Sequence, residues 1–357
     1  MALGIRRASL PQDRGEMIEV LNRNFGTSQE RRFDWRHTLN PAGEAWSWFL
    51  YDTGTLSTVA MATVFPRHMR VNGEDIRGGQ VGEFAVDANY RSLGPAVKLQ
   101  RTTFQPVDSG AISFCYDCPP HDEGMSTFVR IGMRPNCEVH RYALLLRSEE
   151  YLGKRIGDGL WTKPAVAAAN LMLRARPLRR VSVSAEITEH SGKFGEEFSQ
   201  LDKTVLIDGT IRGSRDAKDL NWRYREDPMA SVSMPQGTVG KYRVLVARRA
   251  GELQAFLIFF IQSDGIAILV DLFGRNLGER GLALMQASVD ICRREHVSAF
   301  HAFSSETNEL TPLLRQAGFS RRERNARVVA YSTREDTRFA QKIERCRWAF
   351  SQLEVML

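Results

Sequence analysis

The chain has 357 residues, of which 43% are apolar and 25% charged, and its formal net charge is +7. This is the composition of an ordinary globular protein, and the length favours two domains of about 150 residues each. The positive charge favours an anionic partner, such as a phosphorylated cofactor, nucleic acid or an anionic membrane surface, although many proteins are this basic without one.

The N-terminus, Met-Ala-Leu-Gly-Ile-Arg-Arg, lacks the continuous apolar stretch of a signal peptide, and we expect a cytoplasmic protein. Apolar spacing then predicts the elements of the first half. They are, in chain order, a helix over 17–25, two strands within 45–65 separated by Asp52-Thr53-Gly54, a hairpin turn at Asn72-Gly73, a strand over 80–86, a helix over about 94–104, a strand over 111–116, a short helix ending before Gly132 and a strand over 142–147.

A linker over 148–181 contains a predicted helix, 163–175, followed by Arg176, Arg179 and Arg180. Its apolar run, 165–173, could make peripheral contact with a membrane while the arginines reach phosphates. Alternatively, the helix packs between two domains.

The second half repeats this order of elements. They are strands over 242–248, 254–261 and 266–273, a helix over 278–295, a strand over 298–303, a helix ending before Gly318, a strand over 327–332 and, after Arg334, an amphipathic helix with Phe339, Ile343, Trp348 and Leu353 as its packing stripe. The apolar region 255–273 predicts a β-hairpin and not a membrane helix, because a Ser-Asp-Gly turn interrupts it.

An internal repeat supports this division. The matching landmarks are 35–41 (Trp-Arg-His-Thr-Leu-Asn-Pro) with 222–228 (Trp-Arg-Tyr-Arg-Glu-Asp-Pro), Gly94 with Gly281, and 131–133 (Ile-Gly-Met) with 317–319 (Ala-Gly-Phe). We therefore expect an N-terminal domain over 1–150, a helical linker over 151–181, a C-terminal domain over 182–333 and a C-terminal helix over 334–357. Each domain is expected to be an α/β (α+β) unit with its own core and its own mixed sheet flanked by helices.

The most informative segment leads from the strand over 80–86 into the helix that begins near Gly94. A strand ends, a short turn follows, and a helix opens with Arg91-Ser92-Leu93-Gly94-Pro95-Ala96. The free N–H groups at the helix start attract anions, the small residues permit a close approach, and Arg91 adds positive charge. This arrangement suits a diphosphate, although glycine could instead serve only a tight connection.

A strand, then Val-x-x-x-Tyr-Arg-x-x-Gly-x-Ala, then a helix resembles the coenzyme-A-binding motif of the GCN5-related N-acetyltransferase (GNAT) superfamily. The resemblance extends over most of each half and implies two tandem GNAT-like domains that use acetyl-CoA or another acyl-CoA as a co-substrate. It places the cofactor on Phe84, Ala85, Val86 and the six residues 91–96, with a β-bulge near 84–86 that frees a backbone N–H for the thioester oxygen.

The second copy departs from this motif, since Gly278 stands where the arginine should be and Glu279 opposes a phosphate. We therefore expect donor binding in the first copy and a structural or acceptor-shaping role for the second, although Arg275 and Arg280 could compensate.

The resemblance also implies catalytic groups. Glu83 occupies the strand where the family often carries its carboxylate base, although it could be a solvent-facing strand residue. The family's tyrosine acid is replaced by Phe128 and Leu314, so Tyr116, His121 or water would have to serve, or the protein is catalytically degenerate.

The five cysteines predict neither a disulfide framework nor a metal site. The cysteines at 115 and 118, with His121 nearby, have no second paired ligand motif at a structural zinc spacing.

Three functions fit the sequence. The first is transfer of an acyl group, most simply acetyl, from coenzyme A to an amine of a small molecule or saccharide. A saccharide acceptor is suggested by the layout of two halves around a basic helix, which resembles that of bacterial proteins of surface polysaccharide assembly. The second is an aminoacyl-tRNA-dependent peptidyltransferase, which the complete coenzyme A turn argues against, so we do not expect nucleic acid as a partner. The third is a non-catalytic acyl-CoA-binding scaffold. The sequence does not indicate the oligomeric state.

Overall fold

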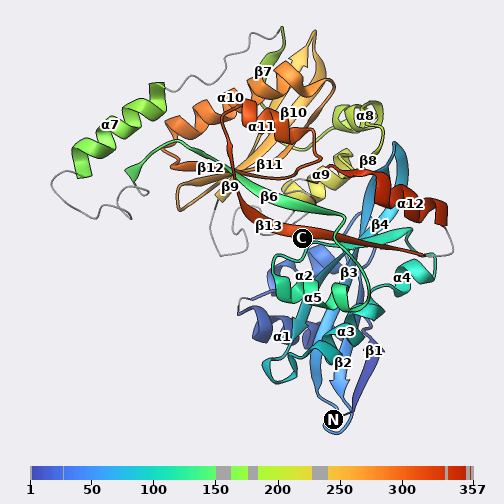
Figure 1. Ribbon diagram of the computed structural model, residues 1–357. Coiled ribbons are helices and arrows are strands. Elements are labelled where there is room, and N and C mark those ends of the chain that lie inside the picture. The colour runs from blue at the N-terminus through green and yellow to red at the C-terminus, as the bar shows by residue number, and fades with distance from the viewer. Residues whose placement is uncertain are drawn as a thin grey trace.

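The computed structural model describes residues 2–26, 28–149, 162–175, 184–226, 240–333, 337–350 and 354. The described strands form one continuous mixed sheet that runs through both halves of the chain (Figure 1). The strands are β1 (Leu3–Arg7), β2 (Trp46–Asp52), β3 (Thr58–Val71), β4 (Glu74–Val86), β5 (Phe114–Asp117), β6 (Cys137–Leu145), β7 (Glu186–Glu189), β8 (Thr210–Gly213), β9 (Gly240–Arg249), β10 (Glu252–Gln262), β11 (Ile266–Gly274), β12 (Ala299–Ser305), β13 (Ser320–Ser332) and β14 (Arg347–Trp348).

The helices cover both faces of this sheet. They are α1 (Arg14–Phe25), α2 (Glu30–His37), the 3-10 turn η1 (Ala88–Tyr90), α3 (Leu93–Thr102), α4 (Gln105–Asp108), α5 (Asp122–Arg130), α7 (Thr162–Ala175), α8 (Glu196–Thr204), α9 (Ala217–Tyr224), α10 (Leu277–Arg294), α11 (Leu310–Gln316) and α12 (Thr337–Arg345). The predicted α/β class is therefore confirmed.

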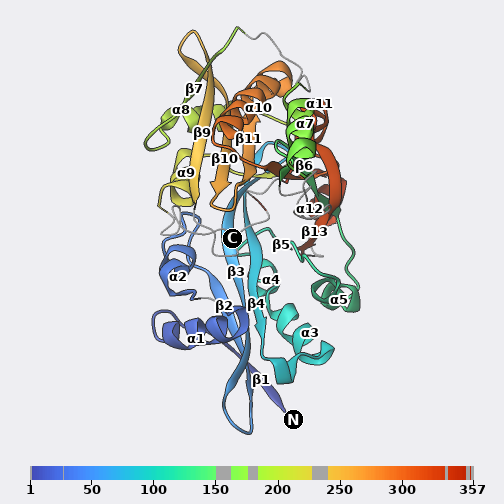
Figure 2. The same cartoon turned by 90° about the vertical axis from the view of Figure 1, so that its left-hand side faces the viewer.

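Alternating side chains of the strands build a core on each face, as the period of a strand requires. In the first half, Trp48 and Leu50 of β2 face the core under α3, α4 and α5, whereas Phe49 faces α1 and α2. In the second half, Leu257 faces α10 and α11, and Phe256 faces α8 and α9. Both halves thus have the same layered build, one below the other in Figure 2.

The two halves meet around a pair of stacked tryptophans, and the repeat is confirmed in three dimensions. Trp35 of α2 and Trp222 of α9 stack with ring centroids 4.5 Å apart. The indole N–H of Trp35 donates to the carbonyl of Trp222 at 2.8 Å, and that of Trp222 donates to the carbonyl of Trp35 at 3.0 Å. Val139 pairs with Ala326 at the same offset of 187 residues. A pseudo-twofold axis therefore passes between equivalent residues.

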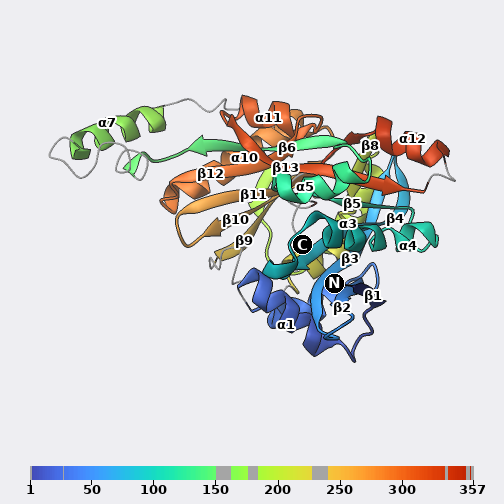
Figure 3. The same ribbon diagram turned by 60° about the horizontal axis from the view of Figure 1, so that its bottom comes forward.

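The two halves are joined more closely than expected, because each half lends the other a strand. The strand order is β4-β5-β13-β6-β12-β11, so β13 inserts beside β5 and β6 lies beside β12 (Figure 3). Tyr142 and Leu144 of β6 are buried in the core of the second half, and Val329 of β13 is buried in that of the first. The exchange buries apolar residues that neither half could cover alone.

Several predicted elements are confirmed and others need correction. The hairpin turn forms with φ of 54° at Asn72 and 81° at Gly73, as its sequence predicts. The C-terminal helix, however, ends at Arg345, and Trp348 lies in β14, which pairs in parallel with β8. Strand pairing replaces helix there because the main chain of β8 offers partners: the Arg347 N–H donates to the Gly209 carbonyl at 2.7 Å. Leu353 lies outside the described residues.

Helix α7 in the linker forms as predicted and stands apart from the sheet (Figures 1 and 3). Leu171 and Met172 on it are 70% and 74% exposed. No described helix is both long and apolar enough to cross a membrane. Arg176, Arg179 and Arg180 lie outside the described residues, as do the residues at the predicted limits 150, 181 and 334, so the domain limits stay a prediction.

Because each half holds a strand of the other, cutting the linker should not separate them. We expect that cleavage at a protease site inserted between residues 153 and 159 leaves two fragments that elute together on size exclusion and separate only in denaturant. Fragments that elute separately as folded units would contradict the strand exchange.

Candidate active site

A β-bulge interrupts the pairing of β3 with β4 in the first half. Thr63 pairs with Gly82 and Met61 with Ala85, so Glu83 and Phe84 together oppose one residue of β3. Glu83 takes a φ of 50°. A bulge leaves a backbone group of the ladder unpaired. The predicted bulge is therefore present, beginning one residue earlier than expected.

The carboxylate of Glu83 is buried and held by two residues of α2. Its Oε1 accepts a hydrogen bond from Nη1 of Arg36 at 2.9 Å, and its Oε2 lies 2.9 Å from Nε2 of His37. Burial alone would raise the pKa of Glu83, but the interactions with His37 and then Arg36 outweigh burial and lower the pKa from 4.5 to about 2.

This environment argues against the prediction that Glu83 removes a proton directly. A carboxylate with a pKa of about 2 accepts protons weakly near neutral pH. The solvent-facing alternative is also wrong, because the side chain is 6% exposed. Nδ1 of His37 has no hydrogen-bond partner among the described residues, and a catalytic role for Glu83 stays a prediction.

The turn after β4 has the predicted form. Helix α3 begins at Leu93 with Ser92 as its N-cap residue, and residues 91–94 are exposed. The first N–H groups of a helix have no acceptor within it. A Cβ atom added at Gly94 would meet nothing within 4 Å, so close packing does not explain this glycine. Pro95 can line the site but has no N–H to donate.

Arg91 is held at this turn without an ion-pair partner. Its Nε donates to the carbonyl of Val86 at 2.8 Å and its Nη2 to Oδ1 of Asn24 at 3.3 Å. No carboxylate pairs with it in the part of the chain that the structure describes. The guanidinium therefore keeps its charge available for an anion at the start of α3.

A groove adjoins the turn between α3 and α5, with a cavity volume of about 550 Å³. Its wall combines apolar and charged side chains, namely Leu93, Met125, Val129, Asp122, Arg130 and Arg327. Arg327 comes from β13, so the exchanged strand brings a residue of the second half into this groove. The size and the mixed lining suit a ligand with an apolar and an anionic part.

Tyr116 and His121, the other catalytic candidates, do not meet Glu83 in any described contact. The hydroxyl of Tyr116 is buried within 3.3 Å of Oε1 of Gln80 and of the main-chain carbonyl of Glu354. Burial raises the pKa of Tyr116 well above its usual value, which makes it a poor acid. His121 is the exposed N-cap residue of α5. The assignment of an acid to either residue is not supported.

The second half has an equivalent bulge, but an apolar residue takes the place of the buried glutamate. Ile258 pairs with Asp271 and Phe259 with Leu269, which leaves Val270 as the extra residue, at the offset of 187 from Glu83. The following turn is distorted, because Gly278 has the non-helical angles φ 3° and ψ −107°. Arg275 already pairs with Glu252 at 2.7 Å. These features agree with the predicted departure of the second copy from the motif.

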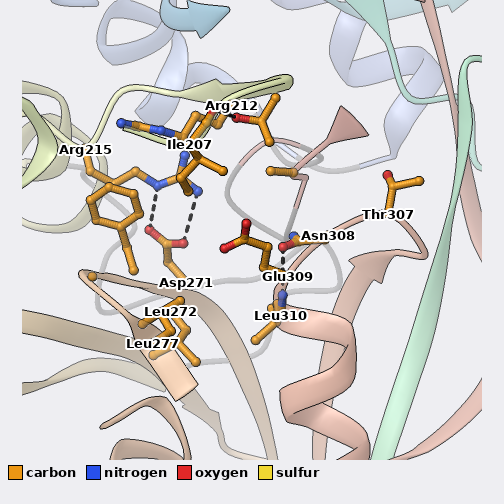
Figure 4. Close-up of a pocket in the computed structure, with 14 residues that line it drawn as sticks. Ile207, Arg212, Arg215, Asp271, Leu272, Leu277, Thr307, Asn308, Glu309 and Leu310 are labelled. Atoms are coloured by element: carbon orange, nitrogen blue, oxygen red, sulfur yellow. Dashed lines mark hydrogen bonds and ion pairs between the residues drawn. The ribbon is translucent and has the colours of Figure 1, made fainter. Parts of the chain in front are cut away.

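A pocket in the second half lies where β11 and β12 diverge, beyond the last pair of Leu269 with Ala302 (Figure 4). One wall holds Arg215, which donates to both oxygens of Asp271 at 3.1 Å. Asn308 at the opposite wall donates to the carbonyl of Phe350 at 3.0 Å, and Ser305 donates its N–H to the same carbonyl. The C-terminal segment thus lies against the opening of the second half.

The cysteines show no feature of a reactive or metal-binding site. Among the described residues, no three His, Cys, Asp or Glu side chains are placed to hold a metal ion. Cys115 is buried beneath α3, and burial raises the pKa of its thiol, as it does for Cys118.

A protein-family model described as an acetyltransferase (GNAT) domain matches residues 5–121, which include the bulge and the turn at Arg91. Residues 5–121 form a GNAT domain. The expected family, the class of acyl-CoA N-acyltransferase and the acyl-CoA co-substrate are thus confirmed at the level of the family. A search of curated proteins finds no match.

Solved structures share the fold over nearly the whole chain. A GCN5-related N-acetyltransferase from Anabaena variabilis has a TM-score of 0.61 and 13% identity, over 92% of this chain and 72% of its own. Saccharomyces cerevisiae N-myristoyltransferase with bound myristoyl-CoA has a TM-score of 0.55 and 12% identity, over 92% and 82%. Eis1 from Mycobacterium abscessus has a TM-score of 0.59 and 13% identity, over 95% and 75%.

The residues that hold Glu83 could not be identified from the sequence. Arg36 and His37 belong to the repeated segment, yet nothing in it indicated contact with Glu83 across 46 residues. Gln80 and Glu354, buried beside Tyr116, are polar residues within apolar surroundings, which could have marked them as members of a buried network.

We expect Glu83→Gln to destabilise the GNAT domain by about 3–5 kcal/mol, because it leaves Arg36 and His37 buried without their carboxylate. Thermal unfolding would measure this loss. Glu30→Gln, which removes an exposed pair with Arg14 at 3.8 Å, is the matched control and should cost less than about 1 kcal/mol. Loss of activity in Glu83→Gln without loss of stability would instead favour a catalytic base.

The same ion pairs predict a dependence on pH. The folded-state pKa of Glu83 lies near 2, below its usual 4.5, so its contribution to stability is complete above the unfolded pKa and is lost as pH falls through the folded pKa. We therefore expect the difference in unfolding free energy between the wild type and Glu83→Gln to shrink as pH falls from 4.5 towards 2. A constant difference would contradict the assigned pairing.

Proposed function

We propose that the GNAT domain of the first half binds one acyl-CoA and transfers its acyl group, most simply acetyl, to an amine. The observation that carries this proposal is the turn at Arg91 to Ala96, where an exposed helix start and an unpaired arginine follow directly on a bulged strand. The diphosphate would bind at the turn and the thioester carbonyl at the bulge.

The reaction is then an aminolysis of a thioester. The nitrogen of the neutral amine attacks the carbonyl carbon, the C–N bond forms, and the C–S bond breaks to release coenzyme A. The amine loses one proton and the departing thiolate gains one. A backbone N–H freed by the bulge would stabilise the oxygen of the tetrahedral intermediate.

The second half supports the proposal of a single donor site. Val270 replaces Glu83, the helix start at Gly278 is distorted, and the C-terminal segment lies against the opening between β11 and β12. We assign this half a structural and acceptor-shaping role.

The acceptor we propose is an amine of a small molecule or saccharide, such as an amino sugar in the assembly of a surface polysaccharide. Polar side chains line the boundary between the halves, among them Gln80, Arg67 and Arg223. The two arginines could donate hydrogen bonds to the hydroxyl oxygens of such a substrate, and the Gln80 amide could donate or accept. Exposed Leu171 and Met172 on α7 are compatible with peripheral membrane contact by a protein acting on lipid-linked saccharides.

Native mass spectrometry and calorimetry should find one coenzyme A per chain. Arg91→Glu should weaken binding by roughly 100-fold or more, because repulsion replaces a charge-assisted contact. Arg280→Glu, the same charge reversal at the turn of the second half, is the control and should change affinity little. Two equal sites, or a loss that follows Arg280 instead, would overturn the assignment of the halves.

A further inference from the structure

Asp117 is a carboxyl group at the point where β4 and β5 begin to diverge, which we call the opening of the first half. The function proposed above gives it no role. Strands β4 and β5 pair from Gly78 with Phe114 to Gln80 with Tyr116. Asp117 is the next residue of β5, and it therefore stands at the point where the two strands begin to diverge. An acyl-CoA bound at the bulge and the turn of β4 would pass in front of this point.

The repeat shows that this position faces the opening. The strand registers relate Asp117 to Ala302, because the Ser113 N–H donates to the Arg77 carbonyl just as the Ser298 N–H donates to the Gly265 carbonyl, which sets the offset from β5 to β12 at 185 residues. Ala302 forms the last pair of β12 with β11, next to the pocket of the second half. In the first half the N–H of Cys118 donates to Oδ1 of Asp117 at 2.6 Å. The first half thus presents a carboxyl group where the second half has the methyl group of Ala302.

The other oxygen of Asp117 is available. The side chain is half-buried, and among the described residues no arginine, lysine or histidine pairs with it. The flanking titratable groups are the thiols of Cys115 and Cys118, and β13 presents Val329 beside it. Burial raises the pKa of Asp117 to about 7, so the group can carry and release a proton near neutral pH.

Asp117 also lies on the appropriate face of the sheet. It alternates with Tyr116 and shares the face of Cys115, which packs under α3, α4 and α5. Tyr116 points to the opposite face, and Phe128 replaces the tyrosine that the family resemblance would supply.

We propose that Asp117 is the acid that protonates the sulfur of coenzyme A as it leaves. The proposal rests on the acyltransferase function proposed above. As the C–S bond of the tetrahedral intermediate breaks, the electron pair goes to sulfur, and the proton of the Asp117 carboxylic acid moves to the same sulfur. The amine proton leaves to water, and the Asp117 carboxylate regains a proton from solvent, so charge and atoms balance over one cycle.

The first test observes the proton directly and needs no acceptor. Infrared difference spectra across neutral pH should show one carboxylic acid that titrates near 7 in the wild type, as its raised pKa requires, and not in Asp117→Asn. Saturating coenzyme A should shift this titration. Absence of such a group, or a titration that bound coenzyme A leaves unchanged, would overturn the proposal. Asp264→Asn, in the exposed hairpin of the second half, is the control that should keep the signal.

The second test varies the leaving group, with hydroxylamine as the probe nucleophile and the hydroxamate product measured. Asp117→Asn should lower the rate with acetyl-CoA by roughly 100-fold and should recover most of that loss with the selenium analogue of acetyl-CoA, because a selenolate leaves without needing a proton. Equal losses with both donors would contradict an acid role.

The pH profile gives an independent measure with the same assay. Because the acid form of Asp117 is required, the wild-type rate should fall as pH rises through about 7, and Asp117→Asn should lack this decline. If Asp117→Asn does not fold, Asp117→Ala introduces the residue found at the equivalent position 302 and serves in its place.

The two proposals can fail separately. If the wild type does not bind coenzyme A, the proposed function itself is wrong. If the wild type and Asp117→Asn bind coenzyme A equally and have the same rates and pH profiles, the function stands and the role of Asp117 falls.

Discussion

The reciprocal contact between Trp35 and Trp222 sets the geometry on which the rest of the molecule depends. Each indole stacks on the other and donates to the main chain of the other's helix, so α2 and α9 are fixed in both distance and angle. Arg36 and His37 follow Trp35 on the same helix and hold Glu83. The bulge of β4 is thereby coupled to the boundary between the halves. A displacement of α2 at that boundary would therefore move the bulge, where the thioester is proposed to bind.

Short sequence patterns were sufficient to predict the turns and helix starts that depend only on neighbouring residues. Asn72-Gly73 forms the expected turn, and the segment around Arg91 forms the expected start of a helix, because turn and cap preferences act within a few residues. The repeat also predicted the shared fold. The exchange of β6 and β13 could not be predicted, because either strand fits either half by its alternation, and only the packing of residues such as Tyr142 selects the partner. The surroundings of Glu83 and Asp117 depend on residues distant in sequence for the same reason.

The two halves differ in the residues that would do chemistry and agree in those that build the fold. Glu83, Arg91 and Asp117 of the first half correspond to Val270, Gly278 and Ala302 of the second. Across the boundary, Arg70 of β3 pairs with Asp202 of α8 at 3.1 Å, and Asp202 also pairs with Arg212, all of them buried. Buried ion pairs add little net stability, yet each is costly to leave unmatched. They therefore select one docking of the halves, which is what a site built at the boundary requires.

The strand exchange has a consequence for synthesis on the ribosome. Strand β5 is complete once residue 117 has emerged, but its neighbour β13 begins at residue 320. One edge of the first-half sheet must therefore stay unpaired while some 200 further residues are made, at about 5–20 residues per second. An unpaired edge invites association with other chains. This topology places the decisive pairing last, and it makes the nascent chain dependent on dilution or on chaperones until its final strand arrives.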